Sequence, residues 1–107
     1  MADLQWNKDF ALEQTAGDEE LLAELLILFR DSSAQDLEQL RRAVATNSPA
    51  EVVTAAHSLK GASASLGLEG IRQVALAMES DGRNNSTAVA RENLAVMVEL
   101  IGLLDTL

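Results

Sequence analysis

Apolar residues recur at helical spacing along almost the whole chain, which contains a single proline, Pro49. The clearest such stripe places Ile71, Val74, Ala75 and Met78 at positions i, i+3, i+4 and i+7. The β-branched residues, in contrast, never settle into the alternating pattern of a strand. The spacing therefore predicts an all-α fold.

Residues that favour helix ends divide this pattern into five expected helices. The clearest start is Ser48-Pro49-Ala50-Glu51, where a capping serine, a proline at the first helical position and a glutamate at the third form a capping box. The expected breaks lie at Gly17, at Gly67 and in the group Gly82, Asn84 and Asn85. The expected helices then cover about residues 7–14, 19–45, 49–66, 69–80 and 86–105.

Short connections between long helices favour antiparallel neighbours. We therefore expect an up-down four-helix bundle with a short additional N-terminal helix. The chain has 107 residues, of which 48% are hydrophobic, and this size and composition suit one hydrophobic core. Residues 1–107 should accordingly form a single domain.

The composition disfavours several classes of function. A formal charge of −9 argues against nucleic acid and membrane surfaces as partners, and the few aromatic residues offer no stacking platform for bases. The absence of cysteine excludes disulfides and thiolate metal sites. The longest apolar run, residues 25–29, is too short to cross a bilayer, and no signal-peptide pattern occurs. We therefore expect a soluble, cytoplasmic protein.

His57, the only histidine of the chain, lies in the third expected helix. The core face of this helix should consist of Val52, Ala55, Leu59, Ala62 and Leu66. At ~100° per residue, His57 falls on the opposite side, together with Val53, Lys60, Gly61 and Ala64. A lone histidine is more often a structural residue, but this placement predicts an exposed imidazole. Exposure by itself still leaves open an ordinary surface residue.

Two neighbours make an exposed His57 more interesting. Gly61 stands in mid-helix, where glycine costs about 1 kcal/mol relative to alanine, and its missing side chain would let another protein approach the imidazole. Lys60 lies at i+3, within side-chain reach. Its ammonium disfavours the imidazolium, keeps more of the neutral nucleophile, and could bind an attached phosphoryl group. A simpler interpretation of Lys60, as a solvated charge, stays open.

The segment from Ala56 to Gly67 carries the motif A-H-x-L-K-G-x-S-x-x-x-G with every fixed position present. In this motif the chain closely resembles histidine-containing phosphotransfer (HPt) domains of two-component phosphorelays. The segments 17–22 and 25–29 also look like the beginning of the long second helix of that family. The resemblance therefore extends over nearly the whole chain.

The resemblance implies a phosphorelay intermediate and not an enzyme with its own kinase or ATP site. His57 would accept a phosphoryl group on Nε2 from the aspartyl phosphate of a receiver domain and pass it to another receiver. Lys60 would steady the phosphoryl group, Gly61 would clear its approach, and Ser63 and Gly67 would serve helix packing and helix termination. No cofactor of its own is implied, because Mg²⁺ would belong to the receiver. The implied partners are response-regulator receiver domains and a hybrid sensor histidine kinase, with this chain as a monomer.

The stretch 21–29 is apolar on more of its circumference than a core stripe needs. We expect Leu28 to join Val53, Gly61 and Ala64 in a small apolar patch around His57, onto which a receiver helix docks. The alternative is that these residues only pack against a second side of the bundle.

Other functions stay open at this point. A non-phosphorylated helical adaptor would bind receiver or kinase domains without chemistry, although it would have no need of His57, Lys60 and Gly61 together. The dimerisation domain of a sensor kinase also presents a helical histidine, but there an acidic residue and an Arg-Thr-Pro run typically follow. A metal, haem or hydrolytic site would need further ligands or a second convergent group.

Overall fold

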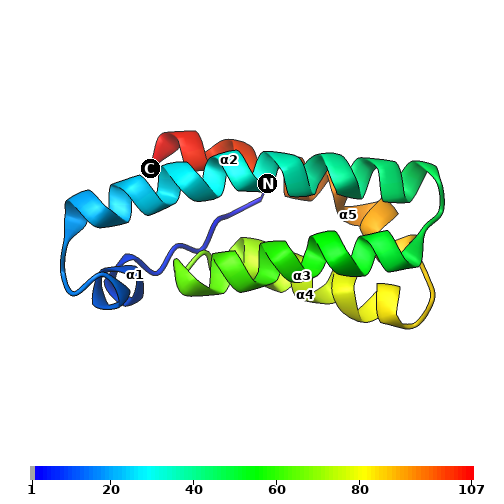
Figure 1. Ribbon diagram of the computed structural model, residues 1–107, viewed down its shortest axis with the longest axis horizontal. Coiled ribbons are helices and arrows are strands. Elements are labelled where there is room, and N and C mark those ends of the chain that lie inside the picture. Colours follow the sequence, from blue (N-terminus) through cyan, green and yellow to red (C-terminus); the bar gives the residue numbers. More distant parts are fainter. Residues whose placement is uncertain (1) are drawn as a thin grey trace.

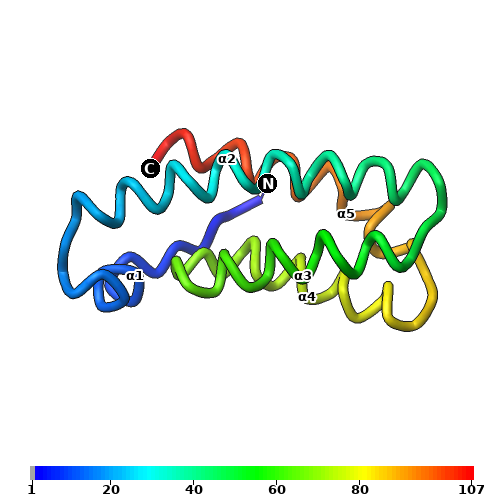
Figure 2. Tube along the Cα trace, in the orientation of Figure 1, coloured from blue at the N-terminus to red at the C-terminus, as the bar shows by residue number. Residues whose placement is uncertain are grey.

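The computed structural model describes residues 2–107 and contains five α-helices (Figure 1). They are α1 (Lys8–Gln14), α2 (Glu19–Ala45), α3 (Pro49–Ser65), α4 (Glu69–Arg83) and α5 (Ala88–Gly102), followed by a 3-10 turn, η1 (Leu103–Thr106). The long helices α2 to α5 run alternately up and down, and the trace in Figure 2 shows α1 folded across one end. The predicted four-helix bundle with an additional N-terminal helix is confirmed. Within residues 2–107, every helix is too short or too polar to span a membrane.

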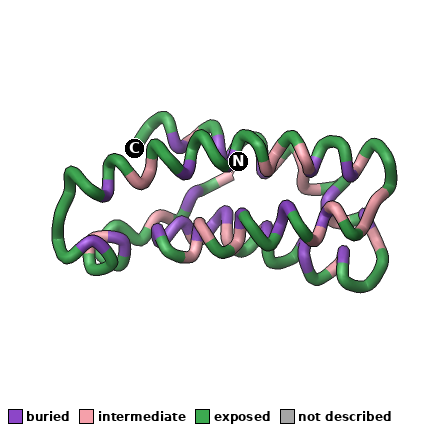
Figure 3. The backbone as a smooth tube through the Cα atoms, viewed as in Figure 1, coloured by how far each residue is buried: buried purple, intermediate pink, exposed green. Residues whose placement is uncertain are grey.

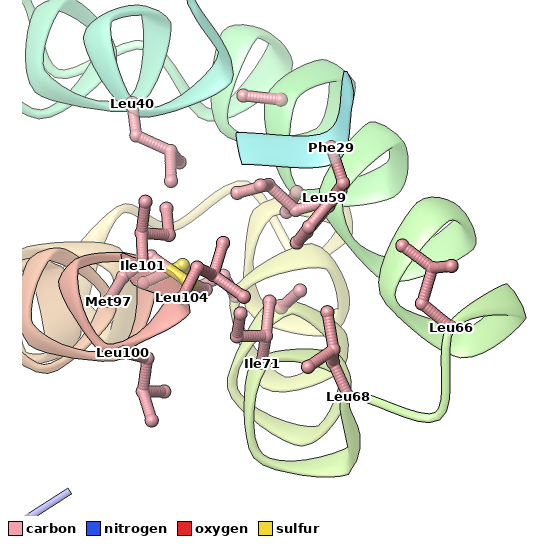
Figure 4. Packing of buried hydrophobic residues seen from close by; sticks show 14 of the residues in the cluster. Phe29, Leu40, Leu59, Leu66, Leu68, Ile71, Met97, Leu100, Ile101 and Leu104 are labelled. Carbon is pink, nitrogen blue, oxygen red and sulfur yellow. The ribbon is translucent and has the colours of Figure 1, made fainter. Parts of the chain in front are cut away.

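The bundle closes around one apolar core. Each long helix contacts two others, because α2 packs on α3 and α5, and α4 packs on the same two. Buried positions face the interior along all four helices, as Figure 3 shows, and in Figure 4 Leu59 and Ile71 approach Met97 and Ile101 from the opposite side. The two predicted stripes are confirmed in large part, with Ala62 and Val74 only half-buried.

The turn between α2 and α3 is built differently from the expected capping box. Asn47 adopts a left-handed conformation (φ 53°) and its N–H donates to the carbonyl of Val44, while the Ser48 N–H donates to Ala43 at 2.8 Å. These are the two bonds of a Schellman motif. The Ser48 N–H is therefore not free for Glu51, and the Ser48 hydroxyl makes no capping bond. The helix start was predicted correctly, but its capping box was wrong.

Gly82 was also misread, because it lies inside α4 instead of ending it. The residue is buried, and a Cβ atom there would stand 2.9 Å from Cγ2 of Val53 and 3.2 Å from the carbonyl oxygen of Pro49. Glycine at this position lets α4 approach α3 closely. The break comes later, at Asn85 (φ 64°), whose N–H donates to the Gly82 carbonyl.

An N-terminal strap, residues 2–7, crosses the turn between α3 and α4. Its Leu4 is buried and accepts a hydrogen bond from the Gly70 N–H, and its Asn7 N–H donates to the Gly67 carbonyl. A Cβ atom on Gly67 would stand 2.5 Å from the Asn7 carbonyl oxygen, and one on Gly70 would stand 2.3 Å from that of Asp3. Gly67 (φ 69°) thus ends α3, as predicted, and also makes room for the strap.

Candidate functional site

His57 lies in the middle of α3 on the face that points away from the core. Its side chain is 65% exposed, whereas Ala55, Ala56 and Leu59 on the inner side of the helix are fully buried. The predicted exposure of the imidazole is therefore confirmed. The core face differs slightly from the expected one, because Ser63 is fully buried while Ala62 is only half-buried. The Ser63 hydroxyl is satisfied by donating to the Leu59 carbonyl at 2.6 Å.

The histidine is not a free surface side chain, because Glu79 of α4 holds it. Oε2 of Glu79 lies 2.7 Å from Nδ1 of His57, and the glutamate side chain is only 4% exposed. An ionised carboxylate only accepts hydrogen bonds, so Nδ1 must carry the proton of the neutral ring. The other nitrogen, Nε2, then keeps its lone pair. This arrangement fixes both the orientation and the tautomer of the imidazole.

Glu79 accepts two further hydrogen bonds, both from cations. Nζ of Lys60 donates to Oε1 at 2.5 Å, and the Arg83 guanidinium donates to Oε2 at 2.9 Å. The Lys60 bond, together with those from His57 and Arg83, outweighs burial and lowers the pKa of Glu79 from 4.5 to about 2. The carboxylate is therefore ionised throughout the neutral range. Its contribution to stability is complete above about pH 4.5 and is lost as the pH falls through about 2.

The position of Lys60 changes the interpretation of this residue. Its side chain is 29% exposed, and its ammonium pairs with Glu79 instead of facing the imidazole as a lone charge. The carboxylate therefore offsets the charge repulsion through which Lys60 was expected to favour the neutral ring. Lys60 nevertheless lies one helical turn from His57. For its predicted contact with an attached phosphoryl group, its ammonium would only have to leave Glu79 and bind the phosphoryl oxygens.

Gly61 has no packing role in the bundle. A Cβ atom at this position would meet no atom within 4 Å, in contrast to the crowded Gly67, Gly70 and Gly82. The fold therefore does not require glycine here, although glycine weakens the helix. The access to His57 expected of Gly61, one turn away, stays a prediction.

Two substitutions of Gly61 should separate its effect on helix stability from its effect on phosphoryl transfer. Gly61→Ala should raise the free energy of unfolding by about 1 kcal/mol, because it removes an exposed mid-helix glycine. Gly61→Leu should fold equally well but slow phosphoryl transfer, because its side chain covers the approach to His57. Denaturant unfolding and transfer assays on both variants check this. Unchanged transfer in Gly61→Leu would remove the access role.

The three residues expected to bind a partner lie in different surroundings. Leu28 is 62% exposed and borders a groove between α2 and α3, whose walls include Leu25, Ala62 and Ser65. Ala64 lines a second groove beside the N-terminal strap, and Val53 packs next to Gly82 of α4. The contact of these residues with a partner stays a prediction.

Glu79 and Arg83 are the site residues that the sequence analysis missed. A signal for Glu79 was present, because it follows Ile71 and Ala75 at four-residue spacing and so falls on the buried face of α4. A carboxylate on such a face requires a cationic or hydrogen-bonding partner. The partner on its own helix, Arg83 at i+4, was readable, but the partners on α3 were not.

The geometry limits the chemistry of the site. The imidazole of His57 is largely exposed, its Nδ1 is held by a buried carboxylate, and two cations pair with that same carboxylate. Within residues 2–107, no group of three histidine, aspartate or glutamate side chains is placed to hold a metal ion. The class defined here is a helical bundle that presents one oriented histidine to another molecule.

Comparison with known proteins names this class. The family model described as the Hpt domain matches residues 24–107, so the chain belongs to the Hpt domain family and has its phosphotransfer role in two-component signalling. Among solved structures, the chain is similar to the HPT domain of a sensor hybrid histidine kinase from Shewanella, with a TM-score of 0.79. The two are 23% identical, and the match covers 97% of this chain and 94% of that one. No curated protein matches the sequence.

Proposed function

We propose that His57 receives a phosphoryl group from the aspartyl phosphate of one receiver domain and passes it to the aspartate of another. The observation that carries this proposal is the pairing of Nδ1 with the buried Glu79, which leaves Nε2 as the exposed nucleophilic nitrogen. Membership of the Hpt domain family supports phosphotransfer chemistry.

The transfer requires little of this chain beyond positioning. The Nε2 lone pair forms a bond to phosphorus while the bond from phosphorus to the aspartate oxygen breaks, and the aspartate leaves as a carboxylate. The ring then carries a positive charge with its proton still on Nδ1, and the ionised Glu79 stabilises that charge. The second transfer reverses these steps onto another aspartate. Mg²⁺ is proposed to belong to the receiver.

The proposed partners are response-regulator receiver domains and a hybrid sensor histidine kinase, with this chain as a monomer in the cytoplasm. The name of the similar Shewanella structure, an HPT domain of a hybrid kinase, supports this pairing. The net charge of −9 supports the exclusion of nucleic acid.

The experiment that tests the function is a phosphotransfer profile. The protein is mixed at short times with each phosphorylated receiver domain of its source organism. We expect an acid-labile, alkali-stable label on the protein with at least one receiver, and loss of that label when a second, unphosphorylated receiver is added. No exchange with any receiver would contradict the proposal and leave the non-phosphorylated adaptor.

The groove beside Leu28 is the proposed docking surface for the receiver. Leu28→Asp should slow transfer by about tenfold or more, because it places a charge in an apolar contact that must lose its water. The fold should tolerate the change, since this side chain is 62% exposed. The transfer rate at several receiver concentrations measures the effect, and circular dichroism checks the fold. Val98→Asp serves as a matched control, because Val98 is an exposed apolar residue on α5.

A further inference from the structure

Glu79 accepts hydrogen bonds from three donors, and two of them are cations. We propose that Arg83 is a positioning residue that stays paired with Glu79 and thereby lets Lys60 leave that carboxylate for the phosphoryl group on His57. This inference rests on the proposed phosphorylation of His57 and assigns a task to a residue outside the family motif found around that histidine.

The three donors are distributed unequally over the two carboxylate oxygens of Glu79. Lys60 occupies Oε1 alone, whereas Arg83 and His57 share Oε2, at 2.9 and 2.7 Å. Loss of Lys60 would therefore leave the contact with Nδ1 intact. It would also leave Oε1 without a partner and the buried carboxylate with one cation fewer.

The arriving phosphoryl group changes the charges around Lys60. It adds up to two negative charges near Glu79, and the ammonium of Lys60, which pairs with Glu79, belongs to the same helix as His57. Lys60 thus stays close to His57 whether its ammonium binds Glu79 or the phosphoryl group. Arg83, in contrast, is one turn from Glu79 on α4 and pairs with it within the same helix.

Without Arg83, Lys60 could not serve both groups. Glu79 is 4% exposed, and a buried carboxylate that loses cationic partners is destabilised. If Lys60 left in the absence of Arg83, the phosphorylated ring of His57 would be the one cationic partner of Glu79. Lys60 would therefore remain on Glu79, and the phosphoryl group would lack its cation. With Arg83 present, Glu79 keeps a positive partner and Lys60 is free to move. A guanidinium suits this task because it is always charged and can offer several N–H groups to one carboxylate.

The test uses phosphorylation by a small donor, phosphoramidate, so that no receiver is needed. Arg83→Gln removes the charge, Arg83→Lys restores it, and Arg72→Gln removes an arginine that pairs with Glu69 on the same helix, away from Glu79. Two quantities are measured for each variant: the half-life of phosphohistidine at neutral pH, and the ¹⁵N shifts of the His57 ring in the free and phosphorylated forms.

We expect Arg83→Gln to shorten the half-life by about fivefold, the upper end of the effect expected for an ion pair whose cation is largely exposed. Its ring shifts should match wild type in the free form, where Lys60 still holds Glu79, and differ in the phosphorylated form. Arg83→Lys should restore half-life and shifts, and Arg72→Gln should leave both unchanged. A wild-type half-life and wild-type shifts in phosphorylated Arg83→Gln would overturn the inference, as would a failure of Arg83→Lys to restore them. If wild type itself is not labelled on His57 by phosphoramidate or any receiver, the proposed function fails first.

Discussion

His57→Gln should acquire no acid-labile label from any phosphorylated receiver domain, a complete loss relative to wild type. His57 is the only histidine in the chain, so no second imidazole can take over. Glutamine has a similar length, but its amide nitrogen is not a nucleophile, and its carbonyl oxygen is far weaker than imidazole. Because the His57 side chain is 65% exposed, the substitution should leave the core untouched. The measurement is autoradiography of the protein after brief incubation with the labelled receiver, with circular dichroism as the check on folding.

The chemical stability of the label provides the control for this experiment. A phosphoramidate is labile in acid and stable in alkali, whereas phosphoserine shows the opposite behaviour. A residual acid-labile label on folded His57→Gln would show that a different group is the acceptor, and the assignment of the site would then be wrong. Ser58→Ala is a matched control next to the site. The Ser58 hydroxyl donates to Asp36 on α2 and not to His57, so this variant should acquire the same label on His57 as wild type.

The helices were predictable because their signals are local. Asp18 caps the start of α2, because its side chain accepts from the Leu21 N–H. This cap, the apolar spacing and the glycine after α3 each act within one or two turns, and the observed bounds of α2 and α3 follow them closely. Local signals were misleading where a contact from elsewhere competes. Gly82 looks like a helix breaker in sequence, but its reason is the approach of Val53 from α3. The Ser48 capping box fails because the preceding helix already uses the Ser48 N–H.

The N-terminal strap had no sequence signal at all. Its contacts join residues far apart in the chain, such as the Trp6 indole N–H and the Leu66 carbonyl, which are 60 positions apart. Nothing in the periodicity of residues 2–7 indicates that they will lie on the turn between α3 and α4. Gly67 was predicted as a helix terminator for a local reason, and the space it leaves for Asn7 became visible only in the folded chain.

The site shows the same division. The exposure of His57 follows from the rotation of one helix, so sequence spacing was sufficient to predict it. The partner of its Nδ1 comes from α4, and only the packing of α4 against α3 brings Glu79 to within 2.7 Å. Gly82, three residues further along α4, permits the close approach of the two helices. The exposure of the imidazole therefore depends on α3 alone, but its orientation depends on the packing of the bundle.

Glu79→Leu is the variant that separates these two properties. It keeps His57 and much of the side-chain volume but removes the acceptor for Nδ1–H, so the ring loses its fixed tautomer and orientation. At metal sites, removal of a group that orients a histidine through its second nitrogen lowers metal affinity or activity by about 10- to 100-fold. We expect the rate of phosphoryl transfer to fall by a similar factor in Glu79→Leu. The rate constant of transfer from a phosphorylated receiver measures it, with unfolding experiments on the same variant.

Glu79→Gln distinguishes orientation from charge. Its amide oxygen can still accept from Nδ1, but it can no longer neutralise the imidazolium that forms when phosphorus binds Nε2. If orientation dominates, this variant transfers at a rate near wild type, and if charge dominates, it is as slow as Glu79→Leu. Whichever effect dominates, the ¹⁵N shifts of the free His57 ring should indicate the Nδ1–H tautomer in Glu79→Gln. In Glu79→Leu they should indicate a mixture of the two tautomers. A Glu79→Leu protein that folds and transfers at the wild-type rate would show that the buried carboxylate stabilises the bundle without assisting the chemistry of His57.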